Sequence, residues 1–231
     1  DRVYRPVAFV RIVRPVNGSP RVKVRLRPTH DWGRIDVDRI TGSNHIRFRA
    51  PTWALRLSTT APVGMVLEER CFRIEKPLHF FLGPDESFAG PLGATVDQML
   101  ADTTAGWQQW VRGLAIPAEW QDVVIRSAIT LKLCQHEETG AIVAALTTSI
   151  PEHADSQRNW DYRYCWIRDA YYTVQALNRL GALDVLEGYL AYLRNIVDAA
   201  GGGHIQPLYG VLGEPRVEER IESGLPGYRG M

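Results

Sequence analysis

Side chains capable of chemistry are concentrated in one short segment, residues 158–170, which reads RNWDYRYCWIRDA. Four aromatic residues, three arginines and two aspartates share these thirteen positions. Burying such a composition is costly unless its polar groups are hydrogen-bonded. A sugar ring offers an apolar face to Trp or Tyr and a rim of hydroxyls that a carboxylate or guanidinium binds through neighbouring oxygens. The composition of the segment therefore fits a carbohydrate site.

The same segment also admits a purely structural interpretation. Asp169 stands where a helical pattern begins, and aspartate is a preferred N-cap residue. Arg168 and Asp161 could then form an ion pair that does no more than fix the loop. Composition alone favours neither interpretation over the other.

The order of residues in the segment adds a second kind of information. Residues 159–170 closely resemble the NWDYRYCWxRDA signature of glycoside hydrolase family 15, which includes glucoamylases, glucodextranases and bacterial trehalase-like enzymes. A match of this length, with Trp, Tyr, Arg and Asp in fixed order, is highly specific. The stretches 139–145 and 147–152 resemble the family's approach to this loop, and 225–230 resembles the stretch before its next block.

The resemblance implies a role for each polar or aromatic residue of the signature. Four residues would line the subsite that holds the terminal glucose, with Arg168 and Asp169 binding its outer hydroxyls. The full set of substrate-binding residues is Tyr162, Trp166, Arg168 and Asp169, and the supporting residues are Asp161 and Tyr164. No metal ligand and no cofactor is expected.

No residue of this chain is assigned a catalytic role. The family's general acid and general base are both glutamates in loops well downstream of the signature, so the resemblance places them beyond Met231. Inversion at a sugar carbon needs two carboxyl groups roughly 6.5–9.5 Å apart. The acidic groups that the sequence does contain are most simply explained as solvated surface residues, namely Glu137, Glu138, Glu214, Glu218, Glu219 and Glu222.

The first third of the chain has the alternating pattern of half-buried strands. Val22, Val24 and Leu26 alternate with basic residues, and Ile46 and Phe48 do the same. Basic residues on the outer face of a sheet are ordinary solubilising groups, so a polyanion-binding face is the less favoured explanation. The spacing is that of an antiparallel sandwich, and strands are expected at 7–14, 21–27, 45–49, 53–58, 65–74 and 78–82.

From about residue 95 the apolar period becomes helical. Helices are expected at about 95–112, from Pro117 to near Gly140, from Asp169 to Leu180, and across a stripe of Leu186, Tyr189, Leu190, Leu193 and Val197. At helical spacing, Trp107, Trp110 and Trp120 are more simply core residues than sugar platforms. The glycines at 201–203 follow a helix, so they are not a phosphate-binding loop.

These patterns predict a multidomain β + α chain. Residues 1–90 are expected to form part of an antiparallel β-sandwich, 91–116 a linker helix, and 117–231 the first helices of an (α/α)6 barrel. This order is implied by the resemblance to bacterial family members. The turn-forming stretch 223–231 and the start at Asp1–Tyr4 suggest that both ends are truncated.

Composition narrows the range of partners. The formal net charge is only +1, which favours neither nucleic acid nor an anionic membrane as a partner. Three widely spaced cysteines, Cys71, Cys134 and Cys165, argue against a disulfide framework or a zinc knuckle and favour a reducing, cytoplasmic compartment. No apolar run reaches the roughly 18 residues of a membrane helix. The partner expected is a carbohydrate, and the oligomeric state cannot be read from the sequence.

Three functions remain open at this stage. The first is a hydrolase that removes glucose from the non-reducing end of a maltooligosaccharide, a glucan or trehalose with inversion. The second is a disaccharide phosphorylase, which resembles this architecture but uses phosphate in place of activated water. The third is a noncatalytic carbohydrate-binding remnant. The signature at 159–169 favours the hydrolase.

Overall fold

The computed structural model describes residues 7–156, 158–225 and 227–230. The truncation arguments at Asp1–Tyr4 and Met231, and Pro226 within the family-like stretch 225–230, therefore concern positions outside the described residues. The chain divides between Thr104 and Ala105 into two compact units, here called the β unit and the helical unit. The elements are β1 (Phe9–Val13), β2 (Arg21–Val22), a 3-10 turn (Asp31–Gly33), β3 (Asp38–Thr41), β4 (His45–Arg49), β5 (Ala54–Thr59), α1 (Val63–Leu67), β6 (Phe72–Arg73), β7 (Leu78–Gly83), α2 (Leu92–Arg112), α3 (Gln121–Lys132), β8 (Cys165–Trp166), α4 (Ile167–Arg179), α5 (Leu183–Ala200), β9 (Leu208–Tyr209) and a second 3-10 turn (Tyr228–Gly230).

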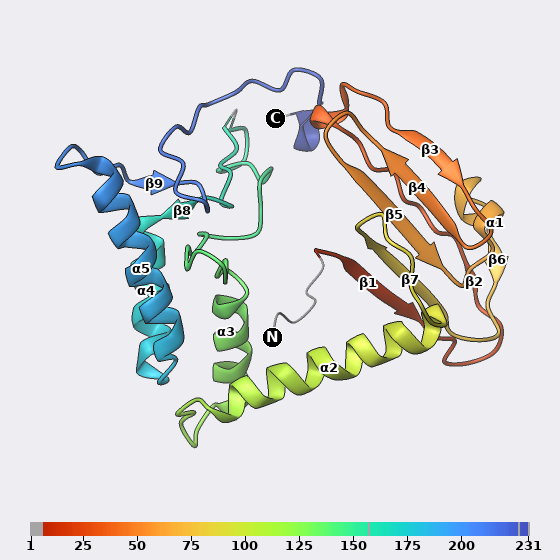
Figure 1. Ribbon diagram of the computed structural model, residues 1–231, viewed down its shortest axis with the longest axis horizontal. Coiled ribbons are helices and arrows are strands. Elements are labelled where there is room, and N and C mark those ends of the chain that lie inside the picture. The colour runs from red at the N-terminus through yellow and green to blue at the C-terminus, as the bar shows by residue number, and fades with distance from the viewer. Residues whose placement is uncertain (1–6, 157, 226, 231) are drawn as a thin grey trace. The chain divides into compact units, whose positions relative to one another are not determined.

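The β unit is built on one antiparallel sheet of five strands in the order β1-β7-β5-β4-β3 (Figure 1). Because successive side chains of a strand point to opposite faces, the apolar positions of β4, β5 and β7 meet on one face. Ile46 lies opposite Leu57, and Leu57 lies opposite Leu82. The buried residues of this core are Ile46, Phe48, Leu57, Ala61, Val66, Phe72, Ile74, Leu78 and Phe80.

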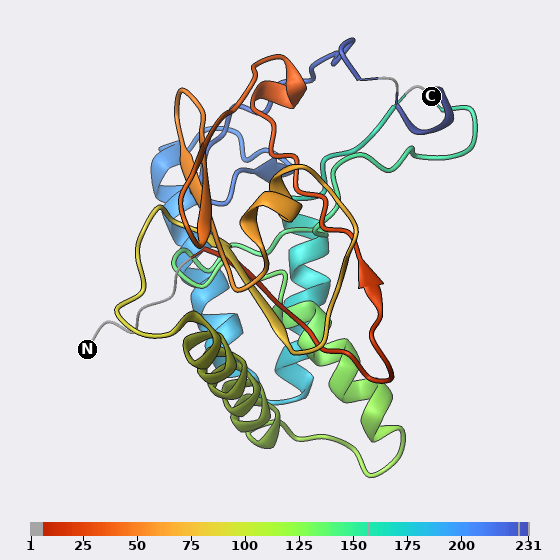
Figure 2. The same cartoon turned by 90° about the vertical axis from the view of Figure 1, so that its right-hand side faces the viewer.

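Two small elements cover that face of the sheet. The short β2–β6 pair contributes Phe72 to the core, and α1 contributes Val66 (Figure 2). The strand predicted over 65–74 is therefore wrong, because its first part belongs to α1 and only Phe72–Arg73 is extended. A short apolar run fits a buried helical turn as well as a strand. The alternation at 21–27 is likewise paired only at Arg21–Val22.

The other face of the sheet carries polar contacts. His79 of β7 is buried and lies 3.4 Å, from Nε2 to Oδ2, from Asp97 in the first part of α2. Arg14 donates to the same carboxylate at 3.0 Å. These contacts link the start of α2 to strand β7 and to the residue that follows β1.

The helical unit has its own core, to which α3, α4, α5, β8 and β9 contribute. The buried residues are Ala128, Ala141, Ile142, Cys165, Ala170, Val174, Leu177, Ala182, Val185, Tyr189, Tyr192, Ile196 and Tyr209. α4 and α5 are joined by a tight turn at Gly181, whose φ of 82° is the left-handed conformation that glycine adopts at little cost. A second glycine allows a close approach: a Cβ at Gly140 would lie 2.0 Å from the carbonyl oxygen of Gly188 on α5.

α5 carries two apolar stripes rather than one. Val185, Tyr189, Tyr192 and Ile196 are buried in the core. A second stripe, called here the outer stripe of α5, follows the alternating three- and four-residue spacing of a helix-packing seam. It consists of Leu183, Leu186, Leu190, Leu193 and Val197, of which Leu183, Leu190 and Val197 are more than half exposed. The predicted stripe was thus only partly right, because it combined Tyr189 from the core with members of the outer stripe.

The tryptophans predicted to be core residues divide into two groups. Trp107 and Trp110 are half-buried and meet edge to face at 5.7 Å, and Trp110 packs against the helical core. Trp120 is 77% exposed and has a φ of 60° at the position before α3, so its core assignment is wrong. The stripe of α3 starts one turn later, with Val124 and Ala128.

Candidate functional site

The signature lies at the end of a two-legged loop formed by residues 144–164. The two legs are held by backbone hydrogen bonds from Ala144 to Tyr164 (3.1 Å), from Ala145 to Tyr162 (3.0 Å) and from Tyr162 to Thr147 (3.0 Å). Further out, Glu152 donates to the carbonyl of Arg158 at 3.0 Å. The loop is therefore internally paired, and this pairing positions residues 161–164 relative to the segment before them.

Asp161 closes a turn with Arg163. Its Oδ1 accepts from the backbone N–H of Arg163 at 3.0 Å and from Nε at 3.1 Å, and its Oδ2 accepts from NH2 at 2.9 Å. Burial tends to raise the pKa of Asp161, but the hydrogen bonds and charge of Arg163 outweigh it and leave the pKa lowered. The suggested ion pair between Asp161 and Arg168 is therefore wrong, because Asp161 pairs within its own turn.

Arg168 and Asp169 lie in the first turn of α4. The helix begins at Ile167 with Trp166 as its N-cap, so the interpretation of Asp169 as the N-cap is wrong. Asp169 instead accepts from Nε and NH2 of Arg168 at 3.2 and 3.1 Å. Their side chains are 76% and 36% exposed, so the pair presents two donor- and acceptor-rich groups to solvent. A carboxylate in a first turn is also favoured by the helix dipole.

Three further side chains of the signature contact one another in a row. The guanidinium of Arg158 lies 5.2 Å from the ring centre of Trp160, and Trp160 meets Trp166 edge to face at 5.9 Å. Nε1 of Trp166 is buried and has no hydrogen-bond partner among the described residues. A buried donor without an acceptor carries a desolvation cost, which a ligand oxygen would remove.

The remaining predicted residues, Tyr162 and Tyr164, are half-buried. Their backbones are paired in the loop as described above, whereas no hydrogen bond among the described residues joins their side chains to Arg168 or Asp169. Of the six predicted residues, Arg168 and Asp169 are in direct contact, and Trp166 meets Trp160, which was not among the six.

Residues 119–230, which include the loop, the signature, α4 and α5, match the family model described as Glycosyl hydrolases family 15. The matched segment belongs to this family. The family therefore covers almost all of the helical unit, and the β unit lies before the matched residues.

Individual relatives extend the likeness to nearly the whole chain. The chain is 31% identical to a trehalase of Mycobacterium tuberculosis and 30% identical to one of Mycolicibacterium smegmatis, each over 95% of this chain and 35% of the relative. A trehalase of Thermoplasma volcanium is 35% identical over 57% of this chain and 20% of its own length. The chain thus spans about a third of the mycobacterial relatives. No solved structure matches it.

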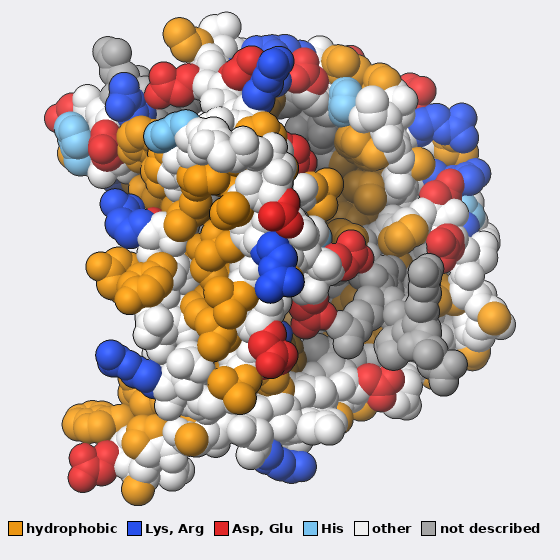
Figure 3. Space-filling model, turned by 60° about the vertical axis from the view of Figure 1, so that its left-hand side comes forward, with side chains coloured by type: hydrophobic (Ala, Val, Ile, Leu, Met, Phe, Trp, Pro, Cys, Tyr) orange, Lys and Arg blue, Asp and Glu red, His pale blue; other side chains and the backbone are white. Residues whose placement is uncertain are grey.

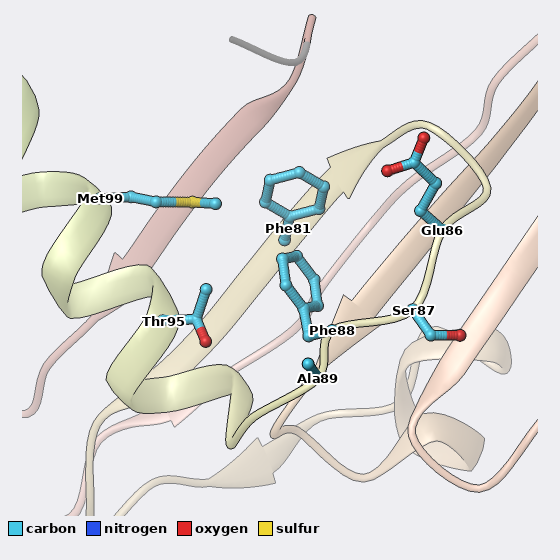
Figure 4. A pocket seen from close by; sticks show the side chains of 7 residues that line it. All are labelled: Phe81, Glu86, Ser87, Phe88, Ala89, Thr95 and Met99. Carbon is cyan, nitrogen blue, oxygen red and sulfur yellow. The ribbon is translucent and has the colours of Figure 1, made fainter. Parts of the chain in front are cut away.

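Two cavities are lined by residues outside the signature. One of about 260 Å³ belongs to the β unit and is lined by Phe81, Glu86, Ser87, Phe88, Ala89, Thr95 and Met99 (Figure 4). Figure 4 shows Phe81, Phe88 and Met99 directed toward one another from β7, the following loop and α2, which is a packing arrangement rather than a polar site. A shallow depression surrounds Trp120 and is lined by Ala118, Gln121, Asp122 and Val123.

Within residues 7–156, 158–225 and 227–230, no three His, Cys, Asp or Glu side chains are grouped in a way that could hold a metal ion. In the same ranges, no helix combines the length and the apolar character that crossing a membrane requires.

Sequence reasoning missed the residues that hold the signature in place. Arg163 was counted as part of the signature, but its pairing with Asp161 was not predicted. Tyr192 was not singled out, although its hydroxyl bonds the backbone beside β9. The only available signal was the spacing of Tyr189 and Tyr192 on one helical face, and that spacing is indistinguishable from ordinary core packing.

Proposed function

We propose that this chain is the N-terminal part of an inverting α-glucosidase, with trehalose as the first substrate to test. The observation that carries the proposal is the arrangement at the start of α4. The buried Nε1 of Trp166, which lacks a partner among the described residues, is followed within three positions by the exposed Arg168–Asp169 pair. A buried N–H without an acceptor, followed along the chain by a guanidinium and a carboxylate, could form hydrogen bonds with the hydroxyl groups of a sugar. The names of the relatives, all trehalases, support trehalose ahead of maltooligosaccharides or glucans.

In this proposal, the chain binds and orients the sugar rather than breaking the bond. Arg168 and Asp169 would grip the outer hydroxyls of the terminal glucose, and Tyr162 and Trp166 would line its subsite. Asp161 and Tyr164 would support them from the loop. The general acid and general base would be glutamates in a part of the protein outside this chain, held at the separation that inversion requires.

The proposed architecture is a β-sandwich followed by an (α/α)6 barrel, with α3, α4 and α5 as its first helices. The outer stripe of α5 supports this view, because a seam of Leu and Val with alternating spacing is suited to a neighbouring helix. Figure 3 views the protein from the left-hand side of Figure 1 and shows apolar side chains gathered on that surface. In the complete protein, further helices of the barrel would cover the stripe.

The reaction is tested with the complete gene product and trehalose, following the released sugars by NMR. Inversion yields one β-glucose and one α-glucose at first, whereas retention yields two α-glucose molecules. Release of glucose 1-phosphate in the presence of phosphate would identify a phosphorylase instead. Absence of any turnover on trehalose, maltooligosaccharides and isomalto-linked glucans would support a noncatalytic sugar-binding role and contradict the proposal.

The site is tested by Asp169→Asn, which keeps the shape of the side chain but exchanges one acceptor for a donor. A site built to bind a hydroxyl discriminates by about 10⁴–10⁵, so kcat/KM is expected to fall by several orders of magnitude while the protein still folds. Asp122→Asn is the matched control, because Asp122 also lies in the first turn of a helix, α3. Loss of activity in both variants, or in neither, would show that Asp169 acts only through its helix.

A deoxy substrate gives an independent check of the same contact. Removing the hydroxyl that Asp169 binds, from a 4-deoxy or a 6-deoxy glucoside, is expected to slow the unmodified enzyme strongly. In Asp169→Asn the penalty for that hydroxyl should largely disappear. A penalty that the substitution leaves unchanged would mean that the subsite lies elsewhere.

A further inference from the structure

Two tyrosines of α5 lie directly behind the signature. Tyr189 and Tyr192 occupy neighbouring turns of one helix face and are 4% and 2% exposed. Their rings are stacked, with centres 6.4 Å apart and planes 24° from parallel. A buried tyrosine needs a partner for its hydroxyl, and both hydroxyls find one in the backbone around the signature.

The two hydrogen bonds bracket the proposed sugar-binding residues. Tyr189 donates from its hydroxyl to the carbonyl of Ile167 at 3.3 Å, and Ile167 lies between Trp166 and Arg168. Tyr192 donates to the carbonyl of Gly210 at 2.7 Å. Gly210 follows β9, whose Tyr209 is paired with Cys165 in the β8–β9 ladder. One hydroxyl therefore holds the start of α4, and the other holds the strand pair that leads into it.

Both hydroxyls keep their protons over the whole pH range in which proteins are stable. Burial, reinforced by the nearby Cys165, raises the pKa of Tyr189 and of Tyr192 well above the usual value for tyrosine. Cys165 of the signature lies close enough to the Tyr192 hydroxyl to contribute to this rise in its pKa. The donors that hold these backbone carbonyls are therefore permanent.

The geometry points to Tyr189 and Tyr192 as positioning residues for the sugar site. They touch no substrate, but they set the backbone that carries Trp166, Arg168 and Asp169. This inference rests on the proposed function, because positioning has a consequence only if those three residues bind a sugar. A displacement of a binding group by about 1 Å can reduce turnover by about a hundredfold, so a modest shift of this backbone is measurable.

The test uses Tyr189→Phe, Tyr192→Phe and the double variant in the complete enzyme, because Phe removes the hydroxyl and keeps the ring. Tyr209→Phe is the matched control: Tyr209 is also buried and also loses one hydrogen bond, accepted from the backbone N–H of Gln206 at 2.9 Å. All variants are expected to lower Tm by a similar small amount. Only the double variant should lower kcat/KM on trehalose, by about tenfold or more, mainly through KM.

The penalty for a deoxy substrate separates positioning from a general loss of stability. If the tyrosines align Arg168 and Asp169, the double variant should discriminate less between trehalose and the deoxy glucoside, whereas Tyr209→Phe should discriminate as the wild type does. Unchanged kcat/KM and unchanged discrimination in the double variant, with Asp169→Asn still inactive, would overturn the inference and leave the proposed function intact. An equal loss in Tyr209→Phe would also overturn it. An inactive wild type would remove the proposed function and this inference together.

Discussion

The β unit and the helical unit differ in how completely their apolar surfaces are covered. In the β unit, the apolar face of β4, β5 and β7 is covered by α1 and the β2–β6 pair, and Leu57 at its centre is 3% exposed. In the helical unit, one stripe of α5 is buried, whereas the outer stripe leaves Leu190 54% exposed. The β unit also exposes Phe9 and Val10, but they lie on the edge strand β1.

This difference reflects two ways in which an amphipathic element can bury its apolar side chains. A sheet with one apolar face is satisfied by a single covering layer, which this chain supplies. A helix with two apolar stripes needs neighbours on two sides. Within the described residues, Leu186 and Leu193 of the outer stripe pack against the helical core, whereas Leu183, Leu190 and Val197 stay more than half exposed. The site residues depend on the second kind of unit, because the signature opens α4 and is held by α5.

The largest expected difference is in independent folding. Limited proteolysis of the 231-residue chain should leave a protected, β-rich piece that contains residues 9–83, whereas the helical unit should be cut faster and bind a hydrophobic dye. The chain alone should not release glucose from any α-glucoside. Recovery of a protected helical piece with no β-rich piece, or glucose release that depends on Asp169, would reverse the comparison.

A matched pair of leucines measures the difference in free energy. Leu57→Ala should lower the free energy of unfolding by about 2–5 kcal/mol, because it leaves a cavity in a closed core. Leu190→Ala in the same chain should change it far less, by about 0.5 kcal/mol, because more than half of the side chain is already in water. Chemical denaturation of the two variants provides both values.

The same two substitutions in the complete protein sharpen the result. If further helices cover the outer stripe, Leu190→Ala should there cost about as much as Leu57→Ala. If Leu190→Ala changes the free energy of unfolding only slightly in both the chain and the complete protein, the stripe stays uncovered. That result would count against the proposed barrel.

The smallest expected effect is on stability at low pH. There, the two units should lose stability in the same way as the pH falls. The hydrogen bonds from Arg47 lower the pKa of Asp85 in the β unit, and Arg163 lowers that of Asp161 in the helical unit despite some burial. A carboxyl whose folded pKa is depressed contributes stability above its unfolded value of about 4, and this is lost as the pH falls through the folded pKa. Tm should therefore decline below about pH 4.

The substitutions Asp85→Asn and Asp161→Asn should each flatten this decline, and their effects should be small because exposed ion pairs contribute little. Thermal melts from about pH 2.5 to about pH 7 test this, because that range includes the pKa values of the carboxyl groups in the folded and unfolded states. A steeper decline in either variant than in the wild type would contradict the assignment of these two carboxyls.

Several elements could be predicted from the sequence because their signals are local. The alternation at 45–49 predicted β4 with its bounds, and the strands expected near 53–58 and 78–82 are β5 and β7, each shifted or extended by one residue. The helix predicted to stop at Gly181 does so, since a left-handed glycine ends a helix through its own backbone. The candidate sugar-binding residues were also named from the signature, and their role stays a prediction.

Other features depended on contacts between distant residues. The run at 65–74 fitted a strand by its composition, but Val66 is buried by the sheet from within a helical turn. Trp120 shares the spacing of a core stripe and is nevertheless exposed, because it precedes α3 in a left-handed conformation. In neither case does the local pattern contain the partner that decides the outcome.

The sequence by itself determined that this chain has a strand-rich part and a helical part, and that one loop carries carbohydrate-type chemistry. Only the tertiary structure decided which stripe of α5 is buried, that Asp161 pairs with Arg163 rather than Arg168, and that Tyr189 and Tyr192 hold the backbone of the signature. The physical reason is that periodicity and composition are properties of neighbouring residues. A hydrogen bond from α5 to Ile167 or Gly210 depends on how segments about 20 residues apart pack together, and local sequence does not encode that packing.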